Sequence, residues 1–272
     1  MDEIEYSYLK RKIRQLLNID IDAYKSQQMR RRLESFVARR EPGSAFRFCK
    51  ALERDEGTLG ELRDMLTINV SEFFRDSVQF EHLRSKVLPE LVRSNPRLNI
   101  WAAGCSHGQE PYSLAILLNE VSAGRRHRIL ATDIDVQAIS RAAAGGPYPP
   151  ADLKNVSERL LQKHFRASDG GYTVADETRS RVEFRQHNLL SDEFEDGFDL
   201  VLCRNVMIYF SNEAKRTLVQ RFHESLKPGG VLFIGGTESL LGIDGAGFER
   251  LFTNFYRKSE GVMAQRRQER AA

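Results

Sequence analysis

The sequence has few of the features that mark disulfide-bonded, zinc-binding or membrane-spanning proteins. Its 3 cysteines, spread over 272 residues, form no Cys-x-x-Cys pair. This argues against a disulfide framework or a metal site and favours a reducing compartment. The opening residues MDEIEYSYLKRK lack the apolar core of an export signal, and no stretch approaches the roughly 18 uncharged apolar residues of a membrane helix. We therefore expect a cytoplasmic chain that is not inserted in a membrane.

A large charge excess and internal repetition are also lacking. The formal net charge of +3 is too small to indicate a nucleic-acid partner by itself. Because no repeat period or low-complexity tract is found, solenoid architectures are excluded. What is present is 41% hydrophobic residues, enough for the core of one large α/β domain and a small accessory domain.

The spacing of the apolar residues changes near residue 95. From about residue 5 to residue 93 they recur three and four apart, as in helices, until Asn95 and Pro96 break the pattern. Beyond this point strands and helices alternate, which predicts βαβ crossovers and a mostly parallel, Rossmann-like α/β sheet. We expect strands at 98–103, 128–134, 182–188, 198–205 and 230–236, and helices beginning near Pro111, Val136 and Glu213. The expected domains are a helical N-terminal domain at 1–93, an α/β domain at 94–258 and a mobile tail at 259–272.

A glycine turn, GCSHGQEPYSLAI, follows the first predicted strand. Gly104 and Gly108 lack a Cβ and so let the backbone approach a ligand closely. The spacing differs from the dinucleotide pattern G-x-G-x-x-G, and Glu110 at the helix start would repel a pyrophosphate. The turn therefore suits a nucleoside ligand without phosphates. The alternative is a tight strand-to-helix turn that binds nothing.

Polar residues follow three further strands. Asp133 stands where α/β nucleotide sites place a carboxylate for ribose hydroxyls, although it could also be a helix cap. Asp135 is the more typical cap for the next helix. Asn188 follows another strand, and Arg204 and Asn205 leave an apolar run. Four strand ends thus supply the donors and acceptors that an adenosyl group requires.

Several motifs together resemble one protein family. NVSEFFRD, WAAGCSHGQEPYSLA, ATDID, FDLVLCRNVMIYF and LKPGGVLFIGGTESL closely resemble the CheR family of chemotaxis receptor methyltransferases. The resemblance implies a class I methyltransferase fold with a small helical N-terminal domain. It also implies methyl transfer from S-adenosylmethionine to receptor glutamates, with S-adenosylhomocysteine as product and without a metal. Two alternatives stay open: a methyltransferase for another substrate, and a non-catalytic module that binds S-adenosylmethionine.

The resemblance also implies roles for individual residues. The implied catalytic pair is Arg75 with Tyr209; an alternative for Arg75 is an ion pair with Asp76 or Glu72. The implied cofactor-binding residues are Asn69, Ser71, Arg75, Gly104, Glu110, Asp133, Asn188, Leu189, Arg204 and Asn205.

A cationic helix is predicted in KSQQMRRRLESFVARR. One face carries Met29, Leu33, Phe36 and Val37, while the other faces carry arginines. Such charges are usually a solvated surface. The resemblance implies instead that they face the cytoplasmic helical bundle of a methyl-accepting receptor; a DNA partner is not favoured, because no groove-reading motif accompanies them. The candidate receptor-binding residues are Arg30, Arg31, Arg32 and Arg39.

An insertion precedes the strand expected at 182–188. Its segment GGYTVADETRSRVEF alternates like a short hairpin, and we expect a small β subdomain at about 165–184. In some members of the resembled family this region docks a pentapeptide at the receptor's C-terminus. The loop RASDGGYTV is short here, so we expect that such a tether is not required.

Overall fold

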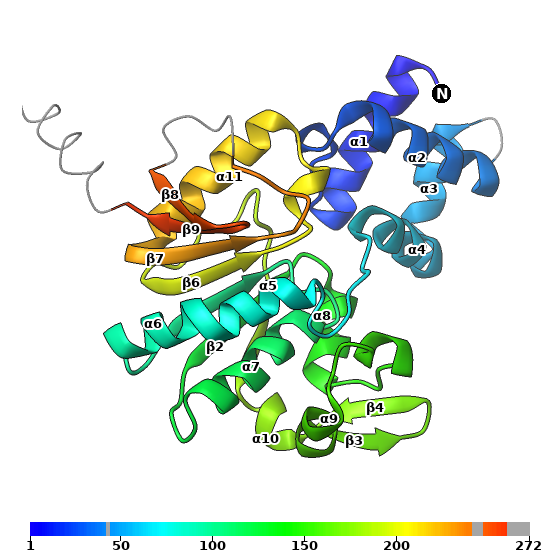
Figure 1. Cartoon of the computed structure of the whole chain (residues 1–272). Coiled ribbons are helices and arrows are strands. Elements are labelled where there is room, and N and C mark those ends of the chain that lie inside the picture. The colour runs from blue at the N-terminus through cyan, green and yellow to red at the C-terminus, as the bar shows by residue number, and fades with distance from the viewer. Residues whose placement is uncertain (42–43, 241–246, 260–272) are drawn as a thin grey trace, which may run out of the picture. The chain divides into compact units, whose positions relative to one another are not determined.

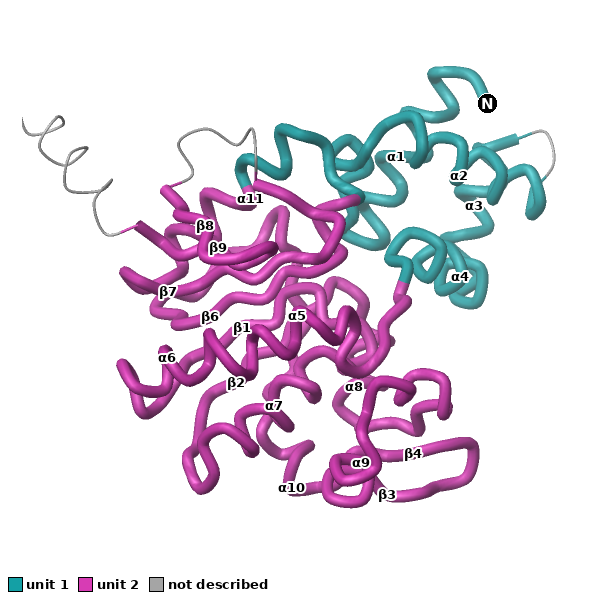
Figure 2. The backbone as a smooth tube through the Cα atoms, viewed as in Figure 1, with its two compact units in different colours: residues 1–68, 209–217 teal, residues 69–208, 218–272 magenta. Residues whose placement is uncertain are grey.

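The computed structural model describes residues 1–41, 44–240 and 247–259, which form two compact units. Unit 1 comprises residues 1–68 and 209–217, and unit 2 comprises residues 69–208 and the chain from 218 onward (Figure 2). Most of the expected tail, from residue 260, lies outside the described residues.

Unit 1 is helical. Its elements are α1 (Glu3–Leu17), η1 (Ile21–Ala23), α2 (Ser26–Arg40), α3 (Ala45–Leu52), α4 (Glu56–Thr67) and the start of α11 (Asn212–Ser225). A capping box of Asp2 and Glu5 begins α1, and Asn18 in the left-handed conformation ends it. On α2 the predicted apolar face is buried: Met29, Leu33, Phe36 and Val37.

The units divide at residue 68, earlier in the chain than the boundary expected at 93/94. The helical stretch between these points consists of α5 (Ser77–His82), η2 (Leu83–Val87) and α6 (Leu88–Ser94). Phe80, Leu83 and Leu88 are buried in the same core as strands of unit 2. Helical periodicity identifies a helix and its apolar face but not the domain against which that face packs.

The sheet of unit 2 contains seven strands in the order β5-β2-β1-β6-β7-β9-β8. All five strands expected from the sequence are present, and neighbours among them pair in parallel. Their bounds are β1 (Asn99–Ala103), β2 (Arg128–Asp133), β5 (Val182–Gln186), β6 (Phe198–Cys203) and β7 (Leu226–Ile234). The strand order reverses between β1 and β6, and the carboxyl ends beside such a switch point are the usual ligand site of an open α/β sheet.

Helices cover both faces of this sheet (Figure 1). The connecting helices α7 (Gln109–Val121) and α8 (Val136–Ala144) begin close to the predicted positions. On one face, Ile100 and Leu202 of the strands share a core with Leu114 of α7. On the other face, Trp101 packs edge-on against Phe222 of α11. Because successive strand residues point to opposite faces, these runs are apolar throughout, as expected of buried parallel strands.

The sequence analysis did not predict the last two strands. β8 (Phe248–Phe252) and β9 (Phe255–Lys258) form an antiparallel pair, and β9 pairs antiparallel with β7. A two-residue turn joins them, with Asn254 in the left-handed region at φ +70°. Two short aromatic runs separated by a turn residue are a hairpin pattern, and this signal was available in FERLFTNFYRK.

The hairpin of the insertion lies earlier than predicted. It consists of β3 (Phe165–Ser168) and β4 (Gly171–Val174), whereas the following residues form α10 (Asp176–Arg179) and then β5 of the main sheet. The turn is Asp169–Gly170. Gly170 and Gly171, the first residue of β4, have φ +86° and +148°, which favour glycine. The remaining elements of this region are η3 (Pro150–Leu153) and α9 (Glu158–His164).

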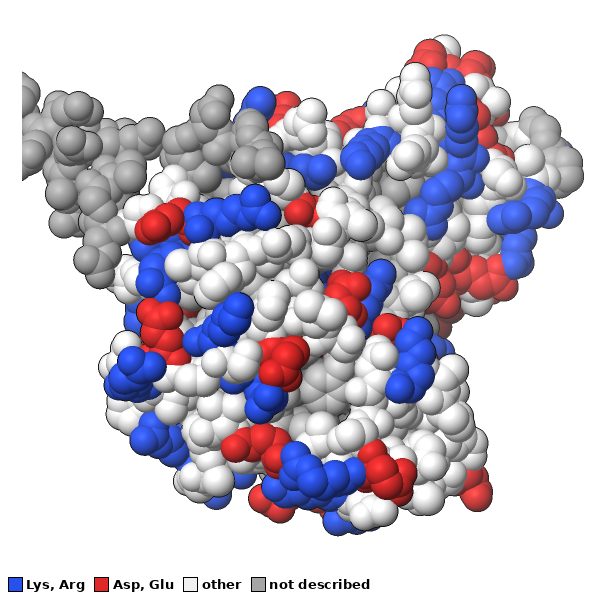
Figure 3. Space-filling model, viewed as in Figure 1, with Lys and Arg blue, Asp and Glu red and all other residues white. Residues whose placement is uncertain are grey.

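The surface carries charges of both signs. Figure 3 shows Lys and Arg side chains interspersed with Asp and Glu over the face drawn. This mixing agrees with the small net charge. Within the described ranges, no helix has the length and apolarity needed to cross a bilayer.

Candidate active site

Four neighbouring strands bring the predicted polar residues to one edge of the sheet. The glycine turn follows β1, Asp133 ends β2, Asn188 follows β5 and Arg204 follows β6. Because these strands are adjacent and parallel, their carboxyl ends lie side by side. The convergence expected from the sequence is therefore present in unit 2.

Arg204 joins three segments of this edge. It is 5% exposed, and its guanidinium donates to Glu110 Oε2 at 3.0 Å, to Asp76 Oδ2 at 2.8 Å and to the carbonyl of Arg75 at 2.9 Å. The same group lies over the rings of Phe80 and Phe233, 5.1 and 4.7 Å from their centroids. The planar guanidinium holds its N–H donors in a fixed arrangement, so it can bind several acceptors at the same time. Arg204 therefore has a positioning role within the protein.

Glu110 has one carboxylate oxygen without a partner. Its Oε2 accepts from Arg204, but the buried Oε1 has no hydrogen bond in the structure. Burial raises the pKa of Glu110, while the nearby Arg204 lowers it. A buried acceptor left unpaired costs free energy unless a ligand supplies a donor or a positive charge. This oxygen therefore marks a place for a cationic group of a ligand.

Arg75 lies in a backbone segment of unusual conformation. Phe74 and Asp76 on either side have φ values of +52° and +59°, which are uncommon for residues with a Cβ. The Arg75 guanidinium donates to the carbonyl of Val70 at 3.0 Å. Asp76 instead pairs with Arg204. Backbone strain of this kind clusters at functional sites and is held here by contacts from neighbouring segments.

The ion pair considered as an alternative role for Arg75 is not formed in the structure. Glu72 pairs with Lys154 at 2.6 Å, and Asp76 with Arg204 at 2.8 Å. Each of the two carboxylates thus already has a cationic partner other than Arg75. The guanidinium of Arg75 keeps donors for a further acceptor, because one contact uses only part of its five N–H groups.

Asp133 accepts two backbone hydrogen bonds. Its Oδ2 accepts from the Ser106 N–H at 2.8 Å and its Oδ1 from the Asp135 N–H at 3.0 Å. Burial raises its pKa. The contact with Ser106 ties the end of β2 to the glycine turn after β1. Each carboxylate oxygen retains a second lone pair for a ligand hydroxyl.

Asp135 has the capping role predicted for it. It caps α8 by accepting from Gln137 and Ala138. Asn69, an expected cofactor contact, donates its amide to Asp135 Oδ2 at 2.7 Å. This bond joins the start of unit 2 to the end of β2.

Glu238 was not among the predicted site residues, although it stands in the quoted motif GGTESL. Its carboxylate accepts from the backbone N–H groups of Asn205 at 2.9 Å, Gly235 at 2.6 Å and Ile208 at 3.1 Å. Burial raises its pKa, and these backbone donors lower it. Glu238 thus fixes Asn205, which has φ +60°, after β6. Nothing in a single sequence shows that a carboxylate after β7 will reach these N–H groups.

The close approach at Gly104 is to the protein itself. Gly104 has φ +85°, and a Cβ there would clash with the Val206 side chain. At Gly108, with φ +93°, the neighbours of a Cβ would be Ala142 and Tyr112. The requirement for glycine at both positions therefore follows from packing against neighbouring side chains, and it needs no ligand.

Replacing Gly104 by alanine should lower the free energy of unfolding by about 3 kcal/mol, since left-handed strain and a clash with Val206 add together. Gly124→Ala is the matched control. Gly124 has φ +80° but open space around it, so only the strain of about 1 kcal/mol applies. Urea unfolding would measure both. Equal losses would contradict the packing argument at Gly104.

The remaining predicted residues are placed as follows. Asn188 is buried, and its Oδ1 accepts from the Leu190 N–H at 2.9 Å. Leu189 is also buried, and Ser71 is partly buried. Tyr209, in η4 (Met207–Tyr209), belongs to unit 1, whereas Arg75 belongs to unit 2. The pairing of these two side chains therefore stays a prediction.

The arginines of α2 are not equivalent. Arg30 pairs with Glu3 and with Glu34, and Arg32 donates to the carbonyl of Met65. Both are partly buried, whereas Arg31 and Arg39 are exposed. The sequence predicts one cationic surface of four arginines. In the structure, Arg30 and Arg32 instead make contacts within unit 1.

The three cysteines are buried, Cys49 in unit 1 and Cys105 and Cys203 in unit 2. Burial raises the pKa of Cys49 to about 11 and the pKa of Cys105 and Cys203 well above the ordinary value, so all three are thiols at neutral pH. Over the part of the chain that is described, no three His, Cys, Asp or Glu side chains gather to hold a metal ion.

Comparison with known proteins gives one family. The model of the CheR methyltransferase, SAM binding domain, matches residues 69–254. A chemotaxis protein methyltransferase of Listeria monocytogenes is 39% identical over 258 residues, covering 94% of this chain and 98% of that protein. Chemotaxis protein methyltransferase 1 of Pseudomonas aeruginosa is 43% identical over 205 residues, covering 70% of this chain and 74% of that protein. The residues matched by the family model include every candidate residue of the site in unit 2.

Proposed function

Because the chain belongs to the CheR methyltransferase family, we propose that it transfers methyl groups from S-adenosylmethionine to glutamate carboxylates of methyl-accepting chemotaxis receptors. The chain is a methyltransferase with the class I fold expected from its sequence. The names of the relatives support the chemotaxis role. The observation that carries the proposal for this site is the unpaired, buried Oε1 of Glu110.

The residues of unit 2 fit S-adenosylmethionine. Its sulfonium and ammonium groups are positive, and Glu110 offers them an acceptor oxygen that is buried and unpaired. Asp133, at the end of β2, has lone pairs for the ribose hydroxyls. The residues proposed to hold the cofactor are Asn69, Ser71, Arg75, Gly104, Glu110, Asp133, Asn188, Leu189, Arg204 and Asn205. Of these, Gly104 and Arg204 act through the protein contacts that they make.

The proposed chemistry needs little from the protein beyond positioning. When bound, S-adenosylmethionine supplies an electrophilic methyl group. A glutamate side chain has a pKa near 4.3, so at neutral pH it is already an anionic nucleophile, and no general base is required. The protein must hold the carboxylate in line and exclude water, which can lower the barrier by roughly 7 kcal/mol or more. We assign to Arg75 the orientation of one carboxylate oxygen, with Tyr209 as its partner.

Asp133→Ala should weaken binding of S-adenosylhomocysteine by about tenfold or more, since a hydrogen bond to a charged group contributes roughly 1.5–3 kcal/mol. Calorimetric titration would measure the change. Asp176→Ala, which removes a carboxylate that is 89% exposed, is the control and should bind normally. Unchanged affinity in the Asp133 variant would show that the ribose assignment is wrong.

Receptor recognition should depend on the exposed arginines of α2. Arg31→Gln/Arg39→Gln should weaken receptor binding several-fold at low salt, with a smaller effect at high salt, because exposed charges act mainly through screened steering. Arg11→Gln/Arg14→Gln on α1 is the charge-matched control. Pull-down of the enzyme on receptor-containing membranes would compare them. Equal loss in both pairs would indicate a general charge effect.

The direct test is incubation with methyl-labelled S-adenosylmethionine and receptor-containing membranes from the protein's own source. Label that mild alkali releases as methanol would identify carboxyl methyl esters. The expected result is alkali-labile label on a receptor, lost in Arg75→Ala. Binding of S-adenosylhomocysteine without any labelled receptor would overturn the proposed substrate and point to another acceptor.

A further inference from the structure

Four arginines line a pocket at the opposite edge of the sheet from the active site. The pocket has a volume of about 760 Å³. It lies at the amino ends of β1, β2 and β5, whereas Asp133 and the glycine turn follow the carboxyl ends. Strands of five or six residues separate the two edges by roughly 17–20 Å. We call it the arginine pocket, after Arg97, Arg126, Arg128 and Arg181.

The cations of the arginine pocket are only partly neutralised. Arg128 pairs with Glu195 at 2.6 Å and with Glu183 at 3.4 Å. Arg181 lies 3.7 Å from Glu177. Arg97 and Arg126 are exposed and have no acidic partner among the residues that the structure describes. Glu177 and Glu183 also line the pocket, so its four guanidinium groups outnumber its two carboxylates.

His127, between Arg126 and Arg128, is hydrogen-bonded to two neighbouring segments. His127 Nδ1 accepts from the Leu98 N–H at 3.1 Å, so its Nε2 carries the proton and lies 2.8 Å from Ser122 Oγ. The N–H of Arg128 donates to the carbonyl of Leu98 at 2.9 Å. His127 is thus neutral and bound to Leu98, just before β1, and to Ser122, just after α7. The backbone at Arg128 is thus held in place, so a ligand need not order it.

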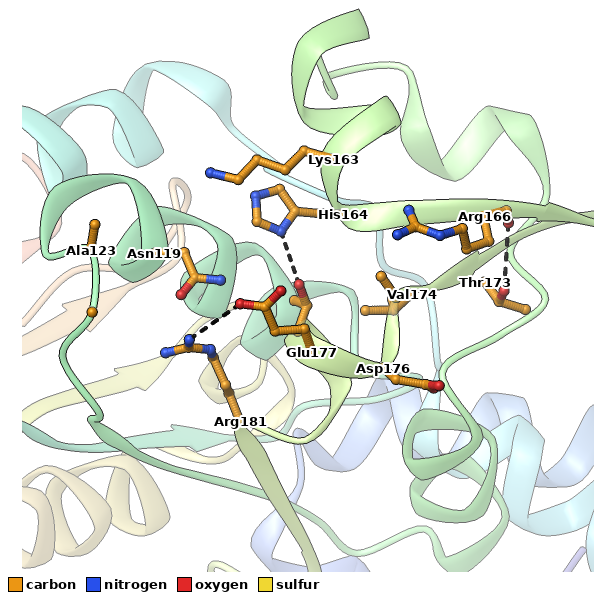
Figure 4. A pocket seen from close by; sticks show the side chains of 13 residues that line it. Asn119, Ala123, Lys163, His164, Arg166, Thr173, Val174, Asp176, Glu177 and Arg181 are labelled. Carbon is orange, nitrogen blue, oxygen red and sulfur yellow. Dashed lines mark hydrogen bonds and ion pairs between the residues drawn. The ribbon is translucent and has the colours of Figure 1, made fainter.

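The adjoining pocket differs, although it shares Arg181 and Glu177 (Figure 4). It has a volume of about 560 Å³ and is lined by Lys163, His164 and Arg166. Lys163 pairs with Glu120 at 2.7 Å, and Arg166 donates to the carbonyl of Phe165 at 2.7 Å. Its cations therefore already have acceptors, whereas Arg97 and Arg126 of the arginine pocket have no acidic partner among the described residues.

We propose that the arginine pocket binds a phosphate chain, either free or as part of a nucleotide. Guanidinium groups present paired N–H donors that match phosphate oxygens, which makes arginine better suited than lysine to this ligand. All four cations of the pocket are arginines, and they come from three segments of unit 2. Because the pocket lies at the other edge of the sheet, its ligand and S-adenosylmethionine can bind together.

Calorimetric titration of the full chain with tripolyphosphate, and separately with ATP, tests the proposal. Saturating S-adenosylhomocysteine is included to keep ATP from the adenosyl site. The wild type should bind one equivalent, and Arg97→Gln/Arg126→Gln should bind at least tenfold more weakly. The control Arg141→Gln/Arg250→Gln removes two exposed arginines elsewhere in unit 2 and should change the affinity less than twofold.

Each outcome of the titration has a definite reading. Equal affinity for tripolyphosphate and ATP would identify the phosphate chain alone as the ligand, and tighter binding of ATP would identify a nucleotide. Absence of binding at millimolar concentration, or equal weakening in the two double variants, would overturn the proposal. Unchanged thermal unfolding of both variants confirms that the comparison is between folded proteins.

Discussion

Arg204→Ala is expected to lower the free energy of unfolding by about 3–5 kcal/mol, since removal of one partner of a buried ion pair leaves the other charge uncompensated. Arg204 is the hydrogen-bonding partner of the Glu110 carboxylate and also holds Asp76 and the Arg75 carbonyl. Methyl transfer should be lost as well, because the Arg75 segment loses its anchor. Urea unfolding and the labelled methylation assay would measure the two effects.

A second variant and the pH dependence test the cause of this loss. Glu110→Gln in the Arg204→Ala background should recover part of the stability, because it removes the unpaired charge. Burial already raises the pKa of Glu110, and without Arg204 this pKa should rise further. A carboxyl group whose pKa is higher in the folded than in the unfolded protein contributes to stability at low pH, and this contribution is lost as the pH rises through the folded pKa. The loss in free energy of unfolding caused by Arg204→Ala should therefore be largest near pH 7 and become smaller towards pH 5. A loss that does not change with pH would contradict the explanation that the Glu110 charge is left uncompensated.

Arg75→Ala should lower kcat about 100-fold, since misplacement of reacting atoms by about 1 Å costs this much. The fold should be little affected, because the contact with Arg204 uses the Arg75 carbonyl and not its side chain. The affinity for S-adenosylhomocysteine should fall by a smaller factor than kcat. Single-turnover methylation at saturating cofactor would measure the chemical step.

Arg75→Lys is the matched variant, since it keeps the charge but not the planar fork. If the fork orients the carboxylate, the lysine variant should be almost as slow as the alanine variant. If only positive charge matters, it should recover most of the rate. Wild-type kcat in Arg75→Ala would show that Arg75 has no part in methyl transfer.

The parallel part of the sheet was predictable because its signal is local. Each strand is a short apolar run bounded by turn residues, and each helix shows its own spacing of three and four. The β8–β9 hairpin was missed because charged residues interrupt the apolar residues of both strands, whereas the parallel strands are more continuous apolar runs. The β3–β4 hairpin lies earlier in the chain than predicted, because the alternation of apolar and polar residues does not by itself show where a chain turns.

The placement of polar residues at strand ends was predictable, as for Asp133 at the end of β2 and for Asn188 and Arg204 shortly after β5 and β6. The contacts of the site were not predictable where the partner comes from far along the chain. Glu238 reaches the N–H of Asn205, and Asp76 reaches Arg204, across separations that carry no local pattern. The same limit applies to the contacts of Arg30 with Glu3 and of Arg32 with Met65, because these acceptors lie in other helices of unit 1.

The sequence by itself determined the alternation of strands and helices, the positions of the polar strand ends and the family, since each depends on residues that are close together in the chain. Only the tertiary structure decided which of these residues hold one another and which remain available to a ligand. Arg204 has acceptors on several sides, while Oε1 of Glu110 has no donor. The physical reason is that hydrogen bonding and desolvation depend on distances in space, which the fold sets only after distant segments have packed together.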